Sequence, residues 1–157
     1  MAPNNMNLVG KKVVISGAGG VIGSHLTERL VALGANVQAF VHYNSNGSWG
    51  LLDESQYKKD IEFVPGDIVD KDGVYQAMDG NELIFHLAAL ISIPYSYNSP
   101  MSYIRTNMEG TYNVLQSARN IGPEKVVITP TSEVYGSAQY VPIDETHPLQ
   151  SLSLIHI

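Results

Sequence analysis

The sequence predicts an α/β domain built on a doubly wound parallel sheet with strand order 3-2-1-4-5. Along the 157 residues, short apolar runs rich in β-branched residues alternate with segments of helical spacing. The runs are continuously apolar, which is typical of parallel strands that helices cover on both faces. A cluster of glycines follows the first run, where such sheets turn from strand into helix.

The first two strands are expected at Val13–Ile15 and Val37–Val41. Between them, apolar residues from Val21 to Leu33 recur at helical spacing, which predicts a helix that packs on the sheet. Gly34 follows directly, and glycine is the residue that most often ends a helix. Strand, helix and strand in this order form one right-handed crossover unit.

The remaining elements continue the alternation. The third and fourth strands are expected at Ile61–Val64 and Leu83–Leu87, with a short helix at Gly73–Met78 between them. A longer helix is expected from about Pro100 to Asn120, and the fifth strand at Val126–Thr129. After that strand the sequence shows no further helical pattern.

Composition narrows the function classes. With 44% apolar residues and a formal net charge of −6, the chain is expected to fold as one compact domain. It has no cysteine, which excludes a disulfide scaffold and a cysteine-ligated zinc site, and no metal site is expected. The acidic balance argues against nucleic acid as a partner. No apolar run approaches the ~20 residues of a membrane span, and Met1–Gly10 lacks a signal peptide's apolar core, so a soluble cytoplasmic protein is expected.

The glycine cluster has the spacing G-x-x-G-x-x-G through Gly17, Gly20 and Gly23. The first glycine would permit a tight turn, the second would let a pyrophosphate approach the backbone, and the third would let helix and strand pack closely. Val21 and Ile22 open the helix, whose N-terminal N–H groups favour phosphate. A glycine-rich turn without a ligand is the alternative. The order of strand, turn and helix favours dinucleotide binding over it.

The acidic residue that usually ends the second strand and binds the ribose 2′-hydroxyl of NAD is missing. Its place falls near Val41, which His42 follows. The cofactor is therefore expected to be NAD or NADP, with His42 either a neighbour of a 2′-phosphate or an ordinary polar residue at a strand end.

Several blocks together resemble the extended short-chain dehydrogenase/reductase family, in the family's own order. They are the turn from Val14 to Leu26 and the blocks Gly66–Ile68, Phe85–Ala89, Asn107–Leu115 and Thr131–Gly136. This resemblance implies a Rossmann-like fold and an NAD(P)-dependent enzyme of the epimerase/dehydratase kind that acts on a nucleotide sugar. It covers roughly residues 10–149.

The resemblance also implies roles for single residues. Beyond the glycine turn and His42, it places these residues at the cofactor: Asp67, Ile68, Leu87, Ala88 and Ala89. Asn107, on the long helix, would help to organise the active site. A structural role is the alternative for each of them, and His86 is expected to be a core histidine.

Thr131-Ser132-Glu133 is similar to the triplet of nucleotide-sugar 4,6-dehydratases and UDP-glucuronate decarboxylases, whereas plain epimerases usually lack the acid. By this resemblance Glu133 removes the C5 proton after oxidation at C4 and assists the loss of water from C6. Thr131 would hydrogen-bond the C4 hydroxyl. Ser132 stands where many dehydratases have Asp, and GDP-mannose dehydratases resemble this chain there. A solvated loop carboxylate is the alternative for Glu133.

Three further segments are similar to UDP-N-acetylglucosamine 4,6-dehydratases of legionaminic-acid-type pathways: Val41–Gly50, Ile93–Tyr97 and Gln139–Glu145. The expected function is therefore a nucleotide-sugar 4,6-dehydratase whose substrate is a UDP-sugar. A UDP-glucuronate decarboxylase or epimerase of the same family and a non-catalytic dinucleotide-binding module are the alternatives.

The family's Tyr-x-x-x-Lys element has no counterpart here, since Tyr135 and Tyr140 are followed four residues later by Gln139 and Asp144. Residues 1–150 are therefore expected to be the N-terminal, cofactor-binding part of a longer enzyme, inactive alone. Residues 151–157 do not resemble the family and are expected to be a non-native tail. Relatives commonly pair through their long helices, so the full-length parent is expected to be a homodimer.

Overall fold

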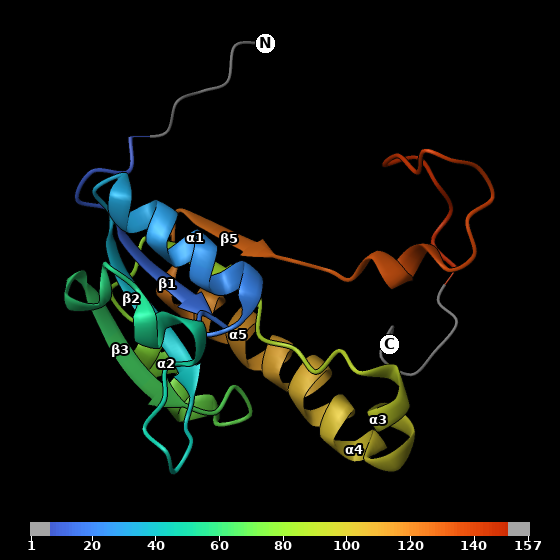
Figure 1. Cartoon of the computed structure of the whole chain (residues 1–157), viewed down its shortest axis with the longest axis horizontal. Coiled ribbons are helices and arrows are strands. Elements are labelled where there is room, and N and C mark those ends of the chain that lie inside the picture. Colours follow the sequence, from blue (N-terminus) through green and yellow to red (C-terminus); the bar gives the residue numbers. More distant parts are fainter. Residues whose placement is uncertain (1–6, 151–157) are drawn as a thin grey trace.

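The computed structural model describes residues 7–150 and confirms the predicted sheet. Five parallel strands lie in the order β3-β2-β1-β4-β5 (Figure 1). Their bounds are β1 Lys12–Ser16, β2 Asn36–His42, β3 Ile61–Gly66, β4 Leu83–His86 and β5 Lys125–Ile128. Because all five strands run the same way, their carboxyl ends share one edge of the sheet.

Helices cover both faces of this sheet, as the apolar runs predict. The helical elements are α1 Val21–Ala32, η1 Gly50–Glu54, η2 Lys58–Asp60, α2 Lys71–Met78, α3 Ile93–Asn98, α4 Pro100–Tyr103, η3 Ile104–Glu109, α5 Gly110–Ile121 and η4 Ser132–Tyr135. Alternate residues of β1 enter different cores. Val13 and Ile15 pack in one cluster with Leu30 of α1, and Val14 packs in the other with Val74 of α2 and Val114 of α5.

Local sequence signals fix the ends of the helices. Helix α1 ends just before Gly34, whose φ of +84° is the left-handed conformation expected of a helix-ending glycine. Helix α2 begins at Lys71, two residues before the predicted start at Gly73. The reason is Asp70, whose carboxylate accepts the backbone N–H groups of Asp72 and Gly73 as an N-cap.

The long helix differs from its prediction. Instead of one regular helix from about Pro100 to Asn120, α4 and α5 are joined by a π-helical segment, η3 Ile104–Glu109. Hydrogen bonds of π type widen the helix locally, and such segments are found frequently at functional sites. Helix α5 then closely approaches the segment that follows β3: a Cβ on Gly110 would lie 2.7 Å from Cγ2 of Ile68.

The segment after β5 leaves the sheet and forms a separate arm (Figure 1). The sequence predicts a loop here, and the described part contains the short helix η4, which that prediction missed. The arm closes on itself, because the N–H of Gln150 donates to the carbonyl of Val134 at 2.8 Å. His147 is buried between the rings of Tyr135 and Tyr140. The expected tail, residues 151–157, lies outside the described residues.

Within residues 7–150, no helix is both long enough and apolar enough to cross a membrane.

Candidate functional site

The glycine turn between β1 and α1 has the geometry its spacing predicts. Gly17 has a φ of +75°, and a Cβ there would lie 2.7 Å from the backbone nitrogen of Ala88. A Cβ on Gly23 would lie only 2.1 Å from the carbonyl oxygen of Gly17, so helix and turn touch. At Gly20 the nearest atom would be 3.4 Å away. Two glycines are therefore required by packing, and the third leaves open backbone.

The amino end of α1 is prepared for an anion. The first N–H groups of a helix have no acceptor within the helix, and here the N-cap is Gly20, which has no side chain to accept them. The first turn carries no acidic residue, and the side chains of Val21 and Ile22 are 67% and 65% exposed. The positive end of the helix dipole therefore faces an open surface at the carboxyl edge of the sheet.

Residues after β4 form the neighbouring wall. The N–H of Leu87 donates to the carbonyl of Ser16 at 3.1 Å, which continues the sheet pairing beyond β4. The side-chain amide of Asn107 binds Leu90 at two points: its Oδ1 accepts the N–H and its Nδ2 donates to the carbonyl, both at 2.9 Å. Asn107 lies in η3, so the π-helical segment fixes the far end of this wall.

A cavity of about 200 Å³ lies between this wall, the long helix and the segment after β5. Its lining brings together two residues predicted at the cofactor, Ala88 and Ala89, and two predicted in catalysis, Asn107 and Thr131. Thr131 is half-buried there. The side chains of Ser132 and Glu133 lie outside the described residues, so the carboxylate base stays a prediction from the sequence.

His86, beneath this wall, is the core histidine that the sequence predicts. It is 3% exposed, with Nδ1 2.7 Å from Oγ of Ser16 and Nε2 2.9 Å from Oγ1 of Thr111. Burial lowers the pKa of His86 to about 4. A neutral ring can accept from Ser16 and donate to Thr111, so it links β1, β4 and α5. Thr111 was missed at the sequence level, although it stands four residues after Asn107 on the same helical face.

Asp67 and His42 meet at the other side of the glycine turn, beyond β3 and β2. Nε2 of His42 lies 3.8 Å from Oδ2 of Asp67, and both side chains are exposed. The other carboxylate oxygen of Asp67 accepts the N–H of Val69 at 2.9 Å. Ile68, also predicted at the cofactor, is buried in the core against α5, and Leu87 packs partly into the opposite core. These two side chains therefore support the site from inside.

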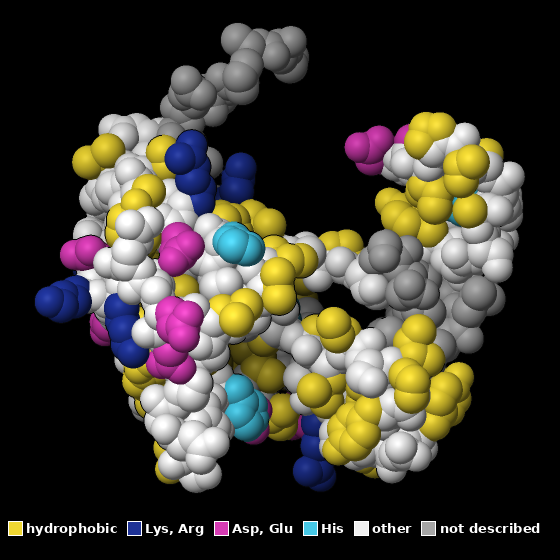
Figure 2. Space-filling view, viewed as in Figure 1, with side chains coloured by type: hydrophobic (Ala, Val, Ile, Leu, Met, Phe, Trp, Pro, Cys, Tyr) yellow, Lys and Arg dark blue, Asp and Glu magenta, His cyan; other side chains and the backbone are white. Residues whose placement is uncertain are grey.

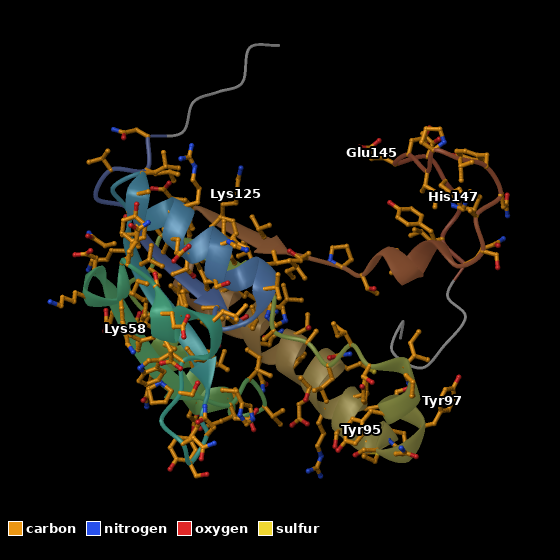
Figure 3. All side chains as sticks on the ribbon, viewed as in Figure 1. Lys58, Tyr95, Tyr97, Lys125, Glu145 and His147 are labelled. Carbon is orange, nitrogen blue, oxygen red and sulfur yellow. The ribbon has the colours of Figure 1, made fainter. Side chains whose placement is uncertain are left out.

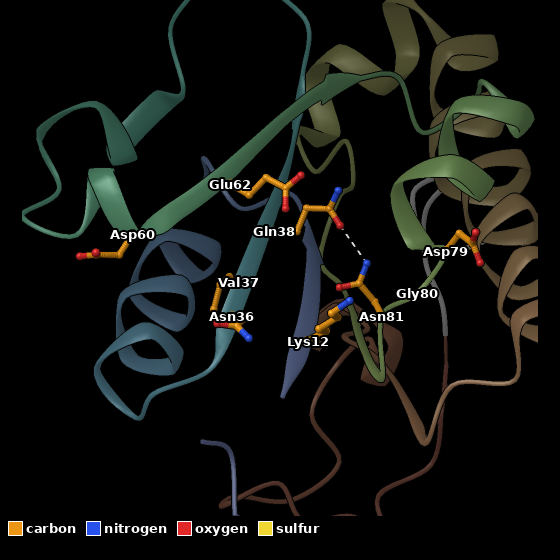
Figure 4. A pocket seen from close by; sticks show the side chains of 9 residues that line it. All are labelled: Lys12, Asn36, Val37, Gln38, Asp60, Glu62, Asp79, Gly80 and Asn81. Atoms are coloured by element: carbon orange, nitrogen blue, oxygen red, sulfur yellow. Dashed lines mark hydrogen bonds between the residues drawn. The ribbon is translucent and has the colours of Figure 1, made fainter. Parts of the chain in front are cut away.

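A larger hollow of about 440 Å³ lies at the opposite edge of the sheet (Figure 4). It is lined by residues near the amino ends of the first strands, among them Lys12, Asn36 and Asp60. Asn81 there donates to Oε1 of Gln38 at 2.8 Å. The turn after α2, with Asp79 and Gly80, completes its lining. Sheets of this kind bind ligands at the carboxyl edge, so this hollow is not the candidate site.

The two remaining segments singled out by the sequence lie apart from the glycine turn. Tyr95 and Tyr97 project from α3 at the end of the long helix, 51% and 70% exposed (Figure 3). His147 and Glu145 lie in the arm after β5 (Figure 3). Among the described residues, no group of three His, Cys, Asp or Glu side chains is arranged to hold a metal ion.

Comparison with known proteins identifies the family. The family described as GDP-mannose 4,6 dehydratase matches residues 14–154. A UDP-N-acetyl-alpha-D-glucosaminuronate decarboxylase from Bacillus cytotoxicus is 34% identical over 80% of this chain and 38% of its own length. A UDP-glucose 4-epimerase from Mycolicibacterium smegmatis is 36% identical over 90% of this chain and 46% of its own length.

Solved structures agree with these sequence matches. A dTDP-glucose 4,6-dehydratase from Streptomyces venezuelae, with NAD and TYD bound, has a TM-score of 0.81 and 29% identity, over 92% of this chain and 47% of its own. A UDP-glucose-4-epimerase from Stenotrophomonas maltophila, with bound NAD and formylated UDP-arabinopyranose, has a TM-score of 0.83 and 26% identity. The match covers 93% of this chain and 44% of the epimerase chain. The chain thus spans less than half the length of these relatives. It belongs to the GDP-mannose 4,6 dehydratase family, within the NAD-dependent epimerases and dehydratases of the extended short-chain dehydrogenase/reductases.

Proposed function

We propose that the chain is the cofactor-binding part of a nucleotide-sugar 4,6-dehydratase. The observation that carries the proposal is the cavity that joins the dinucleotide wall, Ala88 and Ala89, to the segment that opens the Thr131-Ser132-Glu133 triplet. A dehydratase needs this juxtaposition because oxidation at C4 and proton removal at C5 involve neighbouring carbons of one sugar. The proposal is also supported by the presence of a 4,6-dehydratase, the one from Streptomyces venezuelae, among the structural neighbours.

The residues present fit a dinucleotide. The pyrophosphate would lie on the glycine turn, where Gly20 leaves open backbone and α1 presents uncapped N–H groups. The adenosine end would lie toward His42 and Asp67, and the nicotinamide end toward Ala89 and the cavity. When bound, the cofactor would supply hydride acceptance from C4 and hydride return to C6.

The chain's own groups would handle protons and orientation. Thr131, half-buried in the cavity lining, would hydrogen-bond the C4 hydroxyl of the sugar. Glu133 would remove the C5 proton and pass it to the departing C6 hydroxyl, which leaves as water, so the carboxylate is regenerated. The proton released from the C4 hydroxyl during oxidation would go to solvent, and a proton from solvent would add at C5 as the hydride returns to C6. Asn107 would act indirectly, because its amide is occupied by the backbone of Leu90. Wall and triplet would then face the sugar from two sides.

The end of β2 favours NAD over NADP. A 2′-phosphate needs a cation, and residues 41–57 contain neither Lys nor Arg. His42 is the candidate neighbour there, and the carboxylate of Asp67 lies 3.8 Å from its Nε2. That carboxylate would repel a phosphate placed beside His42. NAD, which has no 2′-phosphate, meets no such repulsion.

Two other activities of the family are the second candidate, because the relatives named above include a decarboxylase and an epimerase. Mass spectrometry of the product from the full-length parent and UDP-N-acetylglucosamine separates dehydration from epimerisation. A dehydratase product is lighter by one water and an epimerase product has the same mass. Loss of carbon dioxide from the corresponding uronic acid would identify a decarboxylase. The dehydratase proposal fails if no product lacking water forms. Dinucleotide binding without turnover by the parent would leave the non-catalytic module as the function.

We also propose that the parent is a homodimer and, because its cofactor and substrate are metabolites of the cytoplasm, that it works there. Along the long helix, four apolar side chains are between 45% and 58% exposed: Met101, Met108, Tyr112 and Leu115. The last three are spaced by four and three residues, so they form one stripe, and Met101 lies on α4 before η3. A neighbouring group of apolar side chains is visible over α3 and α4 in Figure 2. A second copy of the same helix would cover the stripe.

A further inference from the structure

The segment that follows β2 and continues into η1 is held by its own side chains. We call residues 44–53 the Trp49 loop. The amide of Asn44 brackets Ser48, accepting its N–H at 3.1 Å and donating to its carbonyl at 2.7 Å. The carboxylate of Asp53 accepts the hydroxyl of Ser48 at 2.5 Å and the N–H of Trp49 at 3.1 Å. The Ser48 hydroxyl bond, above all, lowers the pKa of Asp53, which stays ionised as the hub of the loop.

The loop is also fastened to the sheet. The ring of Trp49 stacks on Phe63 of β3 with centroids 4.8 Å apart and planes 20° from parallel. Leu52 is fully buried in the core on the α1 side of the sheet. Lys58 of η2 donates to the carboxylate of Asp53 at 3.3 Å. The backbone of the loop therefore has little freedom to move relative to β3.

This fixed backbone touches the glycine turn. The N–H of Leu51 donates to the carbonyl of Gly19 at 3.0 Å. A Cβ on Gly50 would lie 2.4 Å from that same oxygen, and a Cβ on Gly19 would lie 2.7 Å from the carbonyl oxygen of Trp49. Neither Gly19 nor Gly50 belongs to the G-x-x-G-x-x-G spacing. Their mutual approach explains why both lack a side chain.

The glycine turn is thus supported on two sides. Gly17 rests against the backbone of Ala88, after β4, and Gly19 rests against Gly50. The open residue of the turn, Gly20, follows directly after Gly19. A shift of Gly19 would therefore move the N–H groups of the turn and the start of α1 together.

We propose that the Trp49 loop is a positioning element of the dinucleotide site, which holds the pyrophosphate-binding turn in place through the contact of Gly50 with Gly19. The inference rests on the proposed dinucleotide binding. The loop itself need not touch the pyrophosphate. Its effect on affinity comes from a turn that is already ordered before the cofactor arrives.

The chain offers a matched pair of variants. Gly50 and Gly47 lie in the same loop with φ of +68° and +64°, but a Cβ on Gly47 would have nothing within 4 Å. Gly50→Ala and Gly47→Ala therefore impose the same backbone conformation on alanine. They differ in the contact with Gly19. Any difference in cofactor affinity between the two variants reports on that contact.

The measurement is a titration of the 157-residue chain with NADH, in which the fluorescence of NADH reports binding. Thermal unfolding of each variant is measured in parallel. We expect G50A to bind NADH at least about tenfold more weakly than G47A, and G47A to bind within about twofold of the unchanged chain. Equal affinities for the two folded variants would overturn the inference. If the unchanged chain binds no NADH, the proposed dinucleotide binding fails instead.

A second pair keeps the test decisive if G50A does not fold. Asp53→Asn keeps an oxygen acceptor for Ser48 and Trp49, whereas Asp53→Ala removes it. We expect D53A to lose NADH affinity and D53N to retain most of it. The chain's single tryptophan, Trp49, reports the loop directly, and its emission should shift to the red in D53A alone. Unchanged affinity in a D53A chain whose Trp49 emission has shifted would contradict the proposed role.

Discussion

His86 shows how a single buried residue joins parts of the chain that are far apart in sequence. Its ring lies between hydroxyls of β1 and α5, at 2.7 Å and 2.9 Å, and is almost fully enclosed. The same hydroxyl of Ser16 accepts the N–H of Ala88, in the segment after β4, at 3.5 Å. The neutral ring satisfies both hydroxyls, whereas a protonated ring would turn an acceptor into a second donor. The geometry is therefore suited to one protonation state.

Stability should therefore fall as pH drops from about 6.5 to about 4. In this window the unfolded chain binds a proton at His86 that the folded chain excludes, since burial lowers the pKa from 6.5 to about 4. The free energy of unfolding is highest above pH 6.5, the pKa of the histidine in the unfolded chain. Between pH 6.5 and pH 4 it should fall by an amount that approaches ~3 kcal/mol. Urea unfolding at a series of pH values measures it. His86→Asn, which cannot titrate, should flatten this slope, and an unchanged slope in H86N would contradict the assignment.

Asp67 is predicted to set cofactor choice through its charge beside His42. The unchanged chain should bind NADH at least about tenfold more tightly than NADPH. Asp67→Asn keeps the acceptor for the N–H of Val69 but removes the negative charge, so the preference should narrow. Glu62→Gln is the control, because it removes the same charge from an exposed position on β3. An equal change in both variants would mean that net charge, and not Asp67, governs the choice.

At the scale of elements, the sequence predicts the features that depend on neighbouring residues along the chain. The five strands and their order followed from apolar runs and right-handed crossovers, and α1 ends where Gly34 predicts. The π-helical segment η3 was not predictable, because nothing in the spacing of Ile104–Glu109 distinguishes it from a regular helix. Its geometry depends on tertiary packing, such as the approach of Gly110 to Ile68.

The candidate site divides in the same way. The glycine turn carries its own signal, since the spacing of Gly17, Gly20 and Gly23 directly after the first strand is visible in the sequence; packing requires two of them and the third leaves open backbone. The clamp of Asn107 on Leu90 joins residues 17 positions apart, and the contact of Gly19 with Gly50 depends on how β2 is followed by a loop that folds back. Such contacts follow from tertiary arrangement, so one sequence cannot reveal them.

The exposed stripe on the long helix leads to a prediction at the same scale. Leu115→Lys places a charge where a second helix would pack, so it should shift sedimentation of the full-length parent from dimer to monomer. Val9→Lys adds the same charge at an exposed apolar residue away from the stripe and should leave the dimer intact. A parent that sediments as a monomer without any substitution would refute the homodimer.

At the scale of the whole molecule, the carboxyl edge of the sheet combines contributions from distant elements. The turn after β1 would hold the pyrophosphate, the segment after β4 forms the wall, and the segment after β5 brings Thr131 to the cavity. The Trp49 loop contacts this edge at Gly19, and His86 contacts it through the hydroxyl of Ser16. Because different segments would bind the cofactor and transfer protons, a substitution should be able to remove one function and leave the other.

Glu133 provides that separation. In the full-length parent, Glu133→Gln keeps a side chain of similar size but cannot remove the C5 proton, so the dehydration rate should fall by about 10²–10⁴-fold. NADH affinity should stay unchanged, because binding depends on the turn and the wall. In deuterated water the unchanged parent should form product that carries deuterium at C5. E133Q should form almost none of this product. Gln139→Glu, an exposed substitution in the arm, is the control and should leave the rate unaltered. Full dehydration activity in E133Q would remove Glu133 from the mechanism, and a parallel loss of NADH affinity would assign it to binding.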